Sequence, residues 1–297
     1  MVSPGILLVD KPAGLTSHDV VARTRRAFGT RKVGHAGTLD PMATGLLVIG
    51  IEGATRLLTY IVGADKTYEA TIRLGQTTGT DDAEGEILTT AAPEAWDSVS
   101  DDAVSAGIAA LTGEISQVPS AVSAIKVDGR RAYDRVRAGE EVVLAARDVV
   151  VSRFDLLASR RGGGHLDLDV IVDCSSGTYI RSLARDLGAA LGVGGHLTAL
   201  RRTRVGPFAV SDAVDIDALE GAPTLTPGEA ARRILPVLEM SSEQARDLRH
   251  GKRLGGQAVR LDAELGAAID PDGVLIGIVE KRGADLKSAM NMPEGDR

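Results

Sequence analysis

The order of strand-like and helix-like segments is the feature that most limits the fold of this 297-residue chain. Residues 68–75 and 165–173 alternate between apolar and polar side chains, which is typical of half-buried strands. Helical patterns near 16–28, 101–112 and 178–191 do not alternate with strands in the regular order of a parallel sheet. We therefore predict an α+β fold with a mixed or antiparallel sheet.

Local signals place further elements along the chain. Residues 6–9 and 46–49 are predicted to be buried strands, and Thr16 with Asp19 forms a capping-box-like start for a helix that ends at Gly29. Residues 118–141 have no firm period, and we predict a mobile basic loop with one helix over 131–138. The domain prediction comprises a large domain over 1–235, a small β-rich module over 236–291 and a disordered tail over 292–297.

Composition excludes several classes of protein. The single cysteine, Cys174, excludes an internal disulfide, and the five histidines lack the paired spacing of zinc ligands, so no metal is predicted. No basic leader precedes the first strand and no apolar run reaches transmembrane length. We predict a soluble protein of the cytoplasm.

The charge distribution bears on the substrate. A net charge of −7 argues against indiscriminate binding to nucleic acids. Basic residues nevertheless gather within 1–60, 126–137 and 201–204, beside candidate site loops. Each cluster has an ordinary explanation as a solvated surface, whereas the three together favour a polyanionic substrate.

The segment 34–45 isolates one carboxylate, Asp40, among glycines and directly before a proline. Proline moves the preceding residue out of the helical region, and the apolar run 46–49 anchors the segment that follows. Two interpretations stay open on these grounds. Asp40 either starts a turn by bonding its own backbone or is the acid of an active site.

Two further residues have both a structural and a functional interpretation. Tyr68 shares one side of its strand with Ala70, Ile72 and Leu74, which favours a core tyrosine. Arg181 falls in the first turn of a helix, where a cation opposes the helix dipole. Its guanidinium therefore invites a specific anionic partner, although a surface salt bridge is the usual role of an arginine.

Several motifs in order resemble one known family. Residues 5–12, 16–19, 34–45, 66–68 and 175–181 together resemble the TruB family of bacterial tRNA pseudouridine synthases, and the likeness extends to about residue 208. The resemblance implies the pseudouridine synthase fold, with a mixed, largely antiparallel central sheet and a PUA-like C-terminal domain. It also implies isomerisation of uridine-55 in the T loop of tRNA by base flipping, without a cofactor. A monomer with no protein or membrane partner is expected, with an additional tRNA-folding role.

The resemblance also assigns roles to residues. Asp40 matches the catalytic aspartate, Arg181 its charge partner and Tyr68 the tyrosine that stacks on the flipped base and helps to move a proton. His35 matches a histidine that stabilises the T loop after the target base has left its stack. Leu200 matches an apolar residue near the uracil pocket, while a plain core role stays equally open. Further predicted contacts with RNA are Lys11, Arg23, Arg26, Lys32, Arg56, Arg130, Arg131 and Arg201.

Two other function classes compete with this interpretation. A non-catalytic protein that binds or folds RNA would keep the scaffold and its basic segments. Alternatively, Asp40 could be a glycosidase nucleophile, but the second carboxylate that such chemistry needs has no candidate nearby in the sequence.

Overall fold

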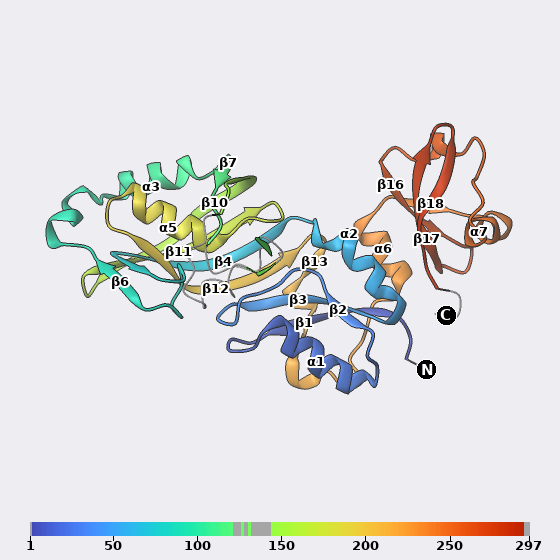
Figure 1. Ribbon diagram of the computed structural model, residues 1–297, viewed down its shortest axis with the longest axis horizontal. Coiled ribbons are helices and arrows are strands. Elements are labelled where there is room, and N and C mark those ends of the chain that lie inside the picture. Colours follow the sequence, from blue (N-terminus) through green and yellow to red (C-terminus); the bar gives the residue numbers. More distant parts are fainter. Residues whose placement is uncertain (1, 121–125, 128–129, 132–143, 294–297) are drawn as a thin grey trace. The chain divides into compact units, whose positions relative to one another are not determined.

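The computed structural model describes residues 2–120, 126–127, 130–131 and 144–293 (Figure 1). Its contacts divide the chain into two compact units. The first unit comprises Met1–Pro41, Gly45–Gly63 and Arg204–Arg297, and the second comprises Met42–Thr44 and Ala64–Thr203. The predicted domain boundary after residue 235 stays a prediction.

The first unit contributes strands to two sheets. Strand β1 pairs antiparallel with β3 and parallel with β14, and β2 pairs antiparallel with β3. Strands β15 to β18 form the other sheet in sequential order. The elements of this unit are β1 (Gly5–Lys11), α1 (Ser17–Phe28), β2 (Val33–His35), β3 (Thr44–Ile51), η1 (Glu52–Leu57), α2 (Leu58–Val62), β13 (Phe208–Ala209), η3 (Val210–Asp212), β14 (Val214–Asp215), η4 (Ile216–Ala218), α6 (Pro227–Ile234), β15 (Val237–Glu239), α7 (Ser242–Arg249), η5 (Ala258–Arg260), β16 (Leu265–Ile269), β17 (Leu275–Arg282) and β18 (Asp285–Asn291).

Helix α1 has the ends that its sequence predicts. Thr16 Oγ1 accepts a hydrogen bond from Asp19 N at 3.1 Å, and Asp19 Oδ2 accepts one from Thr16 N at 2.8 Å. This reciprocal pair is a capping box, which satisfies backbone donors that the first turn leaves without helical partners. Gly29 ends the helix in the left-handed conformation, with φ of 63°.

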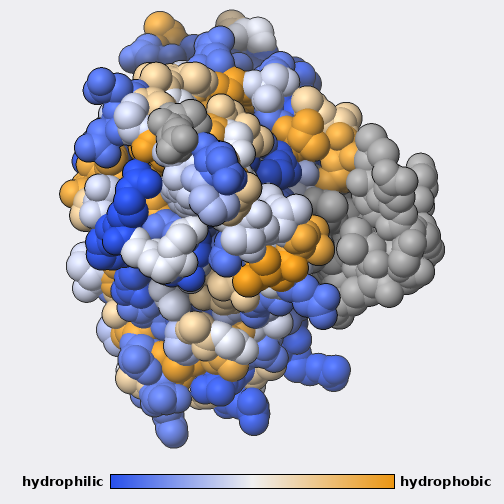
Figure 2. Space-filling view, turned by 90° about the vertical axis from the view of Figure 1, so that its left-hand side faces the viewer, coloured by the Kyte–Doolittle hydropathy of each residue, from blue (hydrophilic) through white to orange (hydrophobic). Residues whose placement is uncertain are grey.

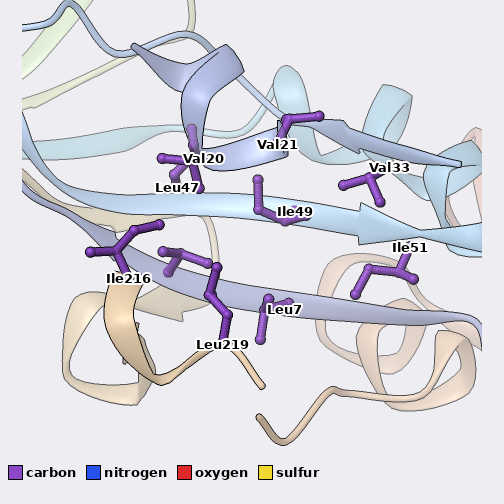
Figure 3. Close-up of a cluster of buried hydrophobic side chains, with 10 residues drawn as sticks. Leu7, Val20, Val21, Val33, Leu47, Ile49, Ile51, Ile216 and Leu219 are labelled. Atoms are coloured by element: carbon purple, nitrogen blue, oxygen red, sulfur yellow. The ribbon is translucent and has the colours of Figure 1, made fainter. Parts of the chain in front are cut away.

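Buried aliphatic side chains fasten α1 to the sheet (Figure 3). Val20 and Val21 come from the helix, and they share one hydrophobic cluster with Leu7 of β1 and with Leu47 and Ile49 of β3. Burying each such side chain stabilises the fold by about 1.5–3 kcal/mol. The N-terminal turn of α1 is therefore held in a fixed position on β1 and β3.

The C-terminal part of the first unit is rich in β structure, as predicted. Strand β15 pairs parallel with β16, while β16, β17 and β18 pair antiparallel around their own hydrophobic cluster. Ser241 caps α7 through a capping box with Gln244. Of the predicted disordered tail, Met292 donates a backbone hydrogen bond to Ile276 at 2.8 Å, and residues 294–297 lie outside the described residues.

The second unit is built on strands in the order β12, β4, β11, β10 and β7. Helices α3 and α5 pack against each other beside these strands (Figure 1). The elements are β4 (Lys66–Leu74), β5 (Gln76–Thr78), β6 (Ile87–Thr90), η2 (Pro93–Ser98), α3 (Asp101–Ala110), β7 (Gly113–Gln117), β8 (Lys126–Val127), β9 (Arg130–Arg131), β10 (Arg147–Gly162), β11 (His165–Cys174), α5 (Ile180–Ala190) and β12 (Gly195–Val205), whose last two residues belong to the first unit.

Strands β4 and β11 show why the alternating segments form a sheet. Their antiparallel register places Arg73 opposite Asp167 and Thr71 opposite Asp169. Arg73 donates two hydrogen bonds to Asp167, at 2.7 and 2.8 Å, and Thr71 donates one to Asp169 at 2.8 Å. The polar face is thus paired across the strands while the other face is buried. The predicted α+β class with a mixed, largely antiparallel sheet is confirmed.

The predicted basic loop over 118–141 is described only in part. Lys126–Val127 and Arg130–Arg131 form the short antiparallel pair β8 and β9, and residues 126–127 and 130–131 are the described part of 121–143. The predicted helix over 131–138 begins at the last residue of β9, and its other residues lie outside the described residues.

The surface combines hydrophilic residues with small apolar areas on the face shown in Figure 2. Exposed apolar side chains of the second unit include Ile87 and Leu88 on β6 and Leu157 on β10. Scattered apolar residues of this kind are ordinary for a globular protein. Within the described ranges, no helix is both long enough and apolar enough to cross a bilayer.

Helix α5 approaches the start of β12 so closely that residue 188 must be glycine. A Cβ atom at Gly188 would lie 2.2 Å from the backbone of Gly194 and Gly195. We expect Gly188→Ala to lower the free energy of unfolding by about 2–3 kcal/mol, because the added methyl forces the two segments apart. Urea denaturation followed by circular dichroism measures this change.

Gly63→Ala is the matched control for this substitution. Gly63 has an ordinary φ of −77°, and a Cβ atom there would have no heavy atom within 4 Å, so the midpoint should stay close to that of the original protein. Equal midpoints for both variants would contradict the close approach of α5.

Candidate active site

The segment between β2 and β3 presents Asp40 on irregular backbone. Asp40 is half-buried, whereas its neighbours Leu39 and Ala43 are buried and anchor the segment. Gly37 and Gly45 have φ of 92° and 99°, which residues with a side chain rarely adopt. The predicted loop with one partly accessible carboxylate is present.

Gly34 has a different role from the one that its position in the loop suggests. It lies in β2, and a Cβ atom there would come within 3.1 Å of Leu58 Cδ1. Its missing side chain therefore makes room for α2.

Lys11 lies inside the protein, with no exposed surface. Its Nζ donates to the carbonyl oxygens of Leu15, Pro12 and Pro41, at 2.7, 2.9 and 3.3 Å. A buried ammonium is stable only when its hydrogen-bonding capacity is used in this way. We therefore reassign Lys11 from the predicted contact with RNA to the support of the loop that carries Asp40.

His35 ends β2, five residues before Asp40, and is half-buried. Its ring meets that of His18 edge to face, with centroids 5.6 Å apart and an angle of 82° between the planes. His18 belongs to the first turn of α1 and has an exposed surface. The predicted role of His35 in binding the T loop stays a prediction, and His18 is a neighbour that sequence reasoning did not include.

Tyr68 occupies the buried face of β4 and is 8% exposed. It lies opposite Val172 of β11 and on the same side as Ala70 and Ile72, as its alternation predicts. Leu200 on β12 is also 8% exposed. Both side chains are thus largely buried and keep a small accessible surface. Their predicted contacts with the base stay predictions.

Arg181 is the second residue of α5, and its side chain is 5% exposed. Its Nη1 lies 3.3 Å from Asp82 Oδ2 and donates to the Thr80 carbonyl at 2.8 Å and to Ser120 Oγ at 3.4 Å. The alternative of a surface salt bridge is wrong, since this arginine is buried and has a buried acidic partner. Its predicted pairing with Asp40, which belongs to the first unit, stays a prediction.

Asp82 is the residue of this site that sequence reasoning missed. Its side chain is 4% exposed, and its Oδ1 accepts hydrogen bonds from Glu84 N at 3.1 Å and from Thr80 Oγ1. The acidic run 81–86 contains it, but such runs are usually solvated. Gly79, Thr80 and Gly85, close to it in the sequence, are local signs of an ordered turn.

The other residues predicted to contact RNA differ in their exposure and in their hydrogen-bond and ion-pair partners. Arg23 forms an exposed ion pair with Asp217 at 3.4 Å, and Lys32 forms one with Glu52 at 3.2 Å. Arg56 donates to the carbonyl of Asn291 at 2.5 Å. Arg26 is exposed on α1, Arg201 donates to Thr44 Oγ1 at 3.4 Å, and Arg130 and Arg131 form β9. Exposed ion pairs contribute little to stability, and the predicted contacts of these residues with RNA stay predictions.

We examined the histidine, cysteine, aspartate and glutamate side chains for arrangements that could bind a metal ion. Across the part of the chain that the structure describes, no group of three or more His, Cys, Asp or Glu residues could hold a metal ion. Cys174 is buried in β11, and burial raises the pKa of its thiol to about 11.

The sequence matches family models along most of its length. Residues 25–180 match the TruB family pseudouridylate synthase N-terminal domain, and residues 181–240 match the tRNA pseudouridylate synthase B C-terminal domain. Residues 235–293 match the tRNA pseudouridine synthase II C-terminal domain.

Individual relatives cover nearly the whole chain. A tRNA pseudouridine synthase B of Leifsonia xyli subsp. xyli is 62% identical over 297 residues, which cover 99% of this chain and 98% of that protein. One of Corynebacterium aurimucosum is 60% identical, with 95% of this chain and 94% of that protein covered. Among solved structures, a chain of a Cbf5-Nop10-Gar1 complex superposes with a TM-score of 0.70 at 25% identity, over 99% of this chain and 85% of that chain.

The fold is that of a pseudouridine synthase, an isomerase. Within that class, the chain belongs to the TruB family.

The buried pair of Arg181 and Asp82 generates a prediction about stability. We expect Asp82→Asn to lower the free energy of unfolding by about 3 kcal/mol, because it removes one charge of a buried ion pair. Asp155→Asn, which removes an exposed ion pair with Arg153 in the same unit, should cost less than about 1 kcal/mol. Urea midpoints of the two variants test this, and equal losses would contradict it.

Lys66 generates a prediction about pH. It is 6% exposed and donates to the Ala64 carbonyl at 2.6 Å. Burial, followed by repulsion from Arg202, lowers the pKa of Lys66 from 10.5 to about 8. Between these two values the unfolded chain binds a proton that the folded chain has released, so stability from this residue rises with pH.

Lys66→Met removes this titration. The quantity to measure is the free energy of unfolding of the original protein minus that of Lys66→Met. This difference should rise by on the order of 2 kcal/mol from pH 8 to pH 10.5. Lys287→Met replaces an exposed lysine and should show no comparable rise. A difference that falls with pH for Lys66→Met would contradict the burial of its charge.

Proposed function

We propose that this protein converts uridine-55 in the T loop of tRNA into pseudouridine. The observation that carries the proposal is the anchored, irregular loop that presents Asp40 in a chain of the TruB family. The relatives from Leifsonia and Corynebacterium are named as tRNA pseudouridine synthases, which supports tRNA as the substrate.

The reaction explains which groups the site must supply. The N1–C1′ glycosidic bond of uridine breaks, the uracil turns, and its C5 joins C1′. The proton that leaves C5 is balanced by the one gained at N1, so no atom is gained or lost. The enzyme therefore needs a carboxylate, a surface that holds the detached base and a path for a proton.

We assign these tasks to three residues. Asp40 acts as the nucleophile or stabilises the detached-base intermediate, and it must be ionised for either role. Tyr68 stacks on the flipped base and assists the proton transfer. Arg181 is the charge partner of Asp40, and its contact with Asp82 fixes the guanidinium.

Recognition of the T stem-loop depends chiefly on shape and phosphate contacts. The chain has one Trp, three Phe and four Tyr, too few for an extended stacking platform. Arg23, Arg26 and Lys32 on and beside α1 would replace their carboxylate or water partners by phosphates. His35 stabilises the opened loop, and the β-rich C-terminal module provides a second RNA contact.

The setting of the reaction follows from its substrate. We place the enzyme in the cytoplasm, where bacterial tRNA is modified, and propose that it acts as a monomer. A tRNA-folding role would accompany catalysis, because base extrusion requires the enzyme to open the T loop.

Asp40→Asn separates catalysis from binding. With unmodified tRNA, we expect the single-turnover rate of pseudouridine formation to fall by about 1,000-fold or more, since amide nitrogen and oxygen cannot replace a carboxylate. The Kd for tRNA should stay within about threefold, because most of the affinity comes from phosphate contacts. Asp155→Asn, at a 55% exposed side chain whose partner Arg153 is not a proposed RNA contact, is the control.

Each result has a distinct meaning. Folded protein that forms no T-loop pseudouridine would contradict the proposed function. Free uracil as the product would favour glycosidase chemistry instead. Undiminished turnover by Asp40→Asn would remove Asp40 from the catalytic role.

A further inference from the structure

Ser17 makes a paired contact with the residue before Asp40. Its side chain is buried, with the residue 1% exposed, at the first position of α1. Ser17 Oγ accepts a hydrogen bond from Leu39 N at 2.9 Å and donates one to Leu39 O at 3.2 Å. One hydroxyl thus satisfies both polar groups of a buried backbone segment.

The residue after Asp40 is held from another direction. The Pro41 carbonyl accepts hydrogen bonds from Gly14 N at 2.8 Å and from Lys11 Nζ at 3.3 Å. Consecutive Cα atoms lie only about 3.8 Å apart. Fixing the backbone of both neighbours therefore leaves the Cα of Asp40 little freedom to move.

The element that carries Ser17 is itself rigid. The capping box of Thr16 and Asp19 fixes the first turn of α1 on either side of Ser17. Val20 and Val21 pack into the hydrophobic cluster of the first unit (Figure 3). The hydroxyl of Ser17 therefore holds the loop at a fixed position relative to this helix.

We propose that Ser17 is a positioning residue that sets where the carboxylate of Asp40 stands relative to the ribose of the substrate. The inference rests on the proposed function, because it assigns Ser17 to the same reaction. Misplacing a reacting group by about 1 Å costs about 100-fold in rate, even when substrate still binds. Ser17 contributes to the rate through geometry alone and touches no reacting atom.

Thr24 offers a matched control on the same helix. Its hydroxyl is also fully buried, and it donates to the Val20 carbonyl at 2.9 Å, within α1. Thr24→Val removes a buried hydroxyl of α1 without touching the loop. A purely structural hydroxyl would behave in the same way at both positions.

The experiment compares Ser17→Ala, Ser17→Cys and Thr24→Val with the original full-length protein. For each protein, the melting temperature, the Kd for unmodified tRNA and the single-turnover rate of pseudouridine formation are measured. Amide hydrogen exchange of the peptide around Leu39, measured without RNA, reports on the contact itself.

We expect Ser17→Ala to slow the single-turnover rate by about 10- to 100-fold with a Kd within about twofold, and to speed exchange at Leu39. Ser17→Cys should be intermediate, since a thiol is a weak donor and acceptor. Thr24→Val should keep its rate within about twofold and its exchange at Leu39 unchanged.

Two results would overturn the inference. One is a Ser17→Ala rate within about twofold of the original. The other is a rate loss no greater than that of Thr24→Val at an equal melting temperature. Where Ser17→Ala does not fold, Ser17→Cys is compared with Thr24→Val by the same criteria. An inactive original protein with faster exchange in Ser17→Ala would contradict the proposed function and leave the contact established.

Discussion

The loop that carries Asp40 depends on one constraint, which is that polar backbone groups buried with an irregular segment must find partners outside a regular ladder. Leu39 is buried, so its amide and carbonyl are not left to water. Ser17 satisfies both, while Lys11 and Gly14 satisfy the carbonyl of Pro41. The same bonds that make burial tolerable also make the loop rigid, so an irregular backbone can hold a carboxylate in one place.

Features with a local cause could be predicted from the sequence. The capping box and Gly29 define both ends of α1 within a few residues, and alternation defines the buried face of β4, with Tyr68 on it. The irregular backbone at Asp40 follows from Asp-Pro and the neighbouring glycines. In each case the deciding interaction lies within one element or between residues close in the chain.

Features that depend on distant partners could not be predicted in the same way. Asp82 and Arg181 are far apart in the sequence, and no local pattern marks this one acid of the run 81–86 as buried. A lysine is usually found at the surface of a protein. The carbonyls that bind Lys11 belong to irregular segments, whose conformation could not be predicted from the sequence. The need for a glycine at position 34 likewise comes from a distant residue, because the side chain of Leu58 packs against Gly34 only in the folded protein.

The buried pair of Arg181 and Asp82 is not explained by stability alone, because well-packed apolar residues of similar volume are often no less stable than a buried ion pair. What apolar residues cannot do is fix the orientation of a planar cation. Three acceptors, on Asp82, Thr80 and Ser120, hold one nitrogen of the guanidinium at the start of α5. A guanidinium held in this way has one orientation, whereas a surface arginine adopts many. Burying two charges is costly, so the pair is best explained by the fixed position that it gives to the guanidinium.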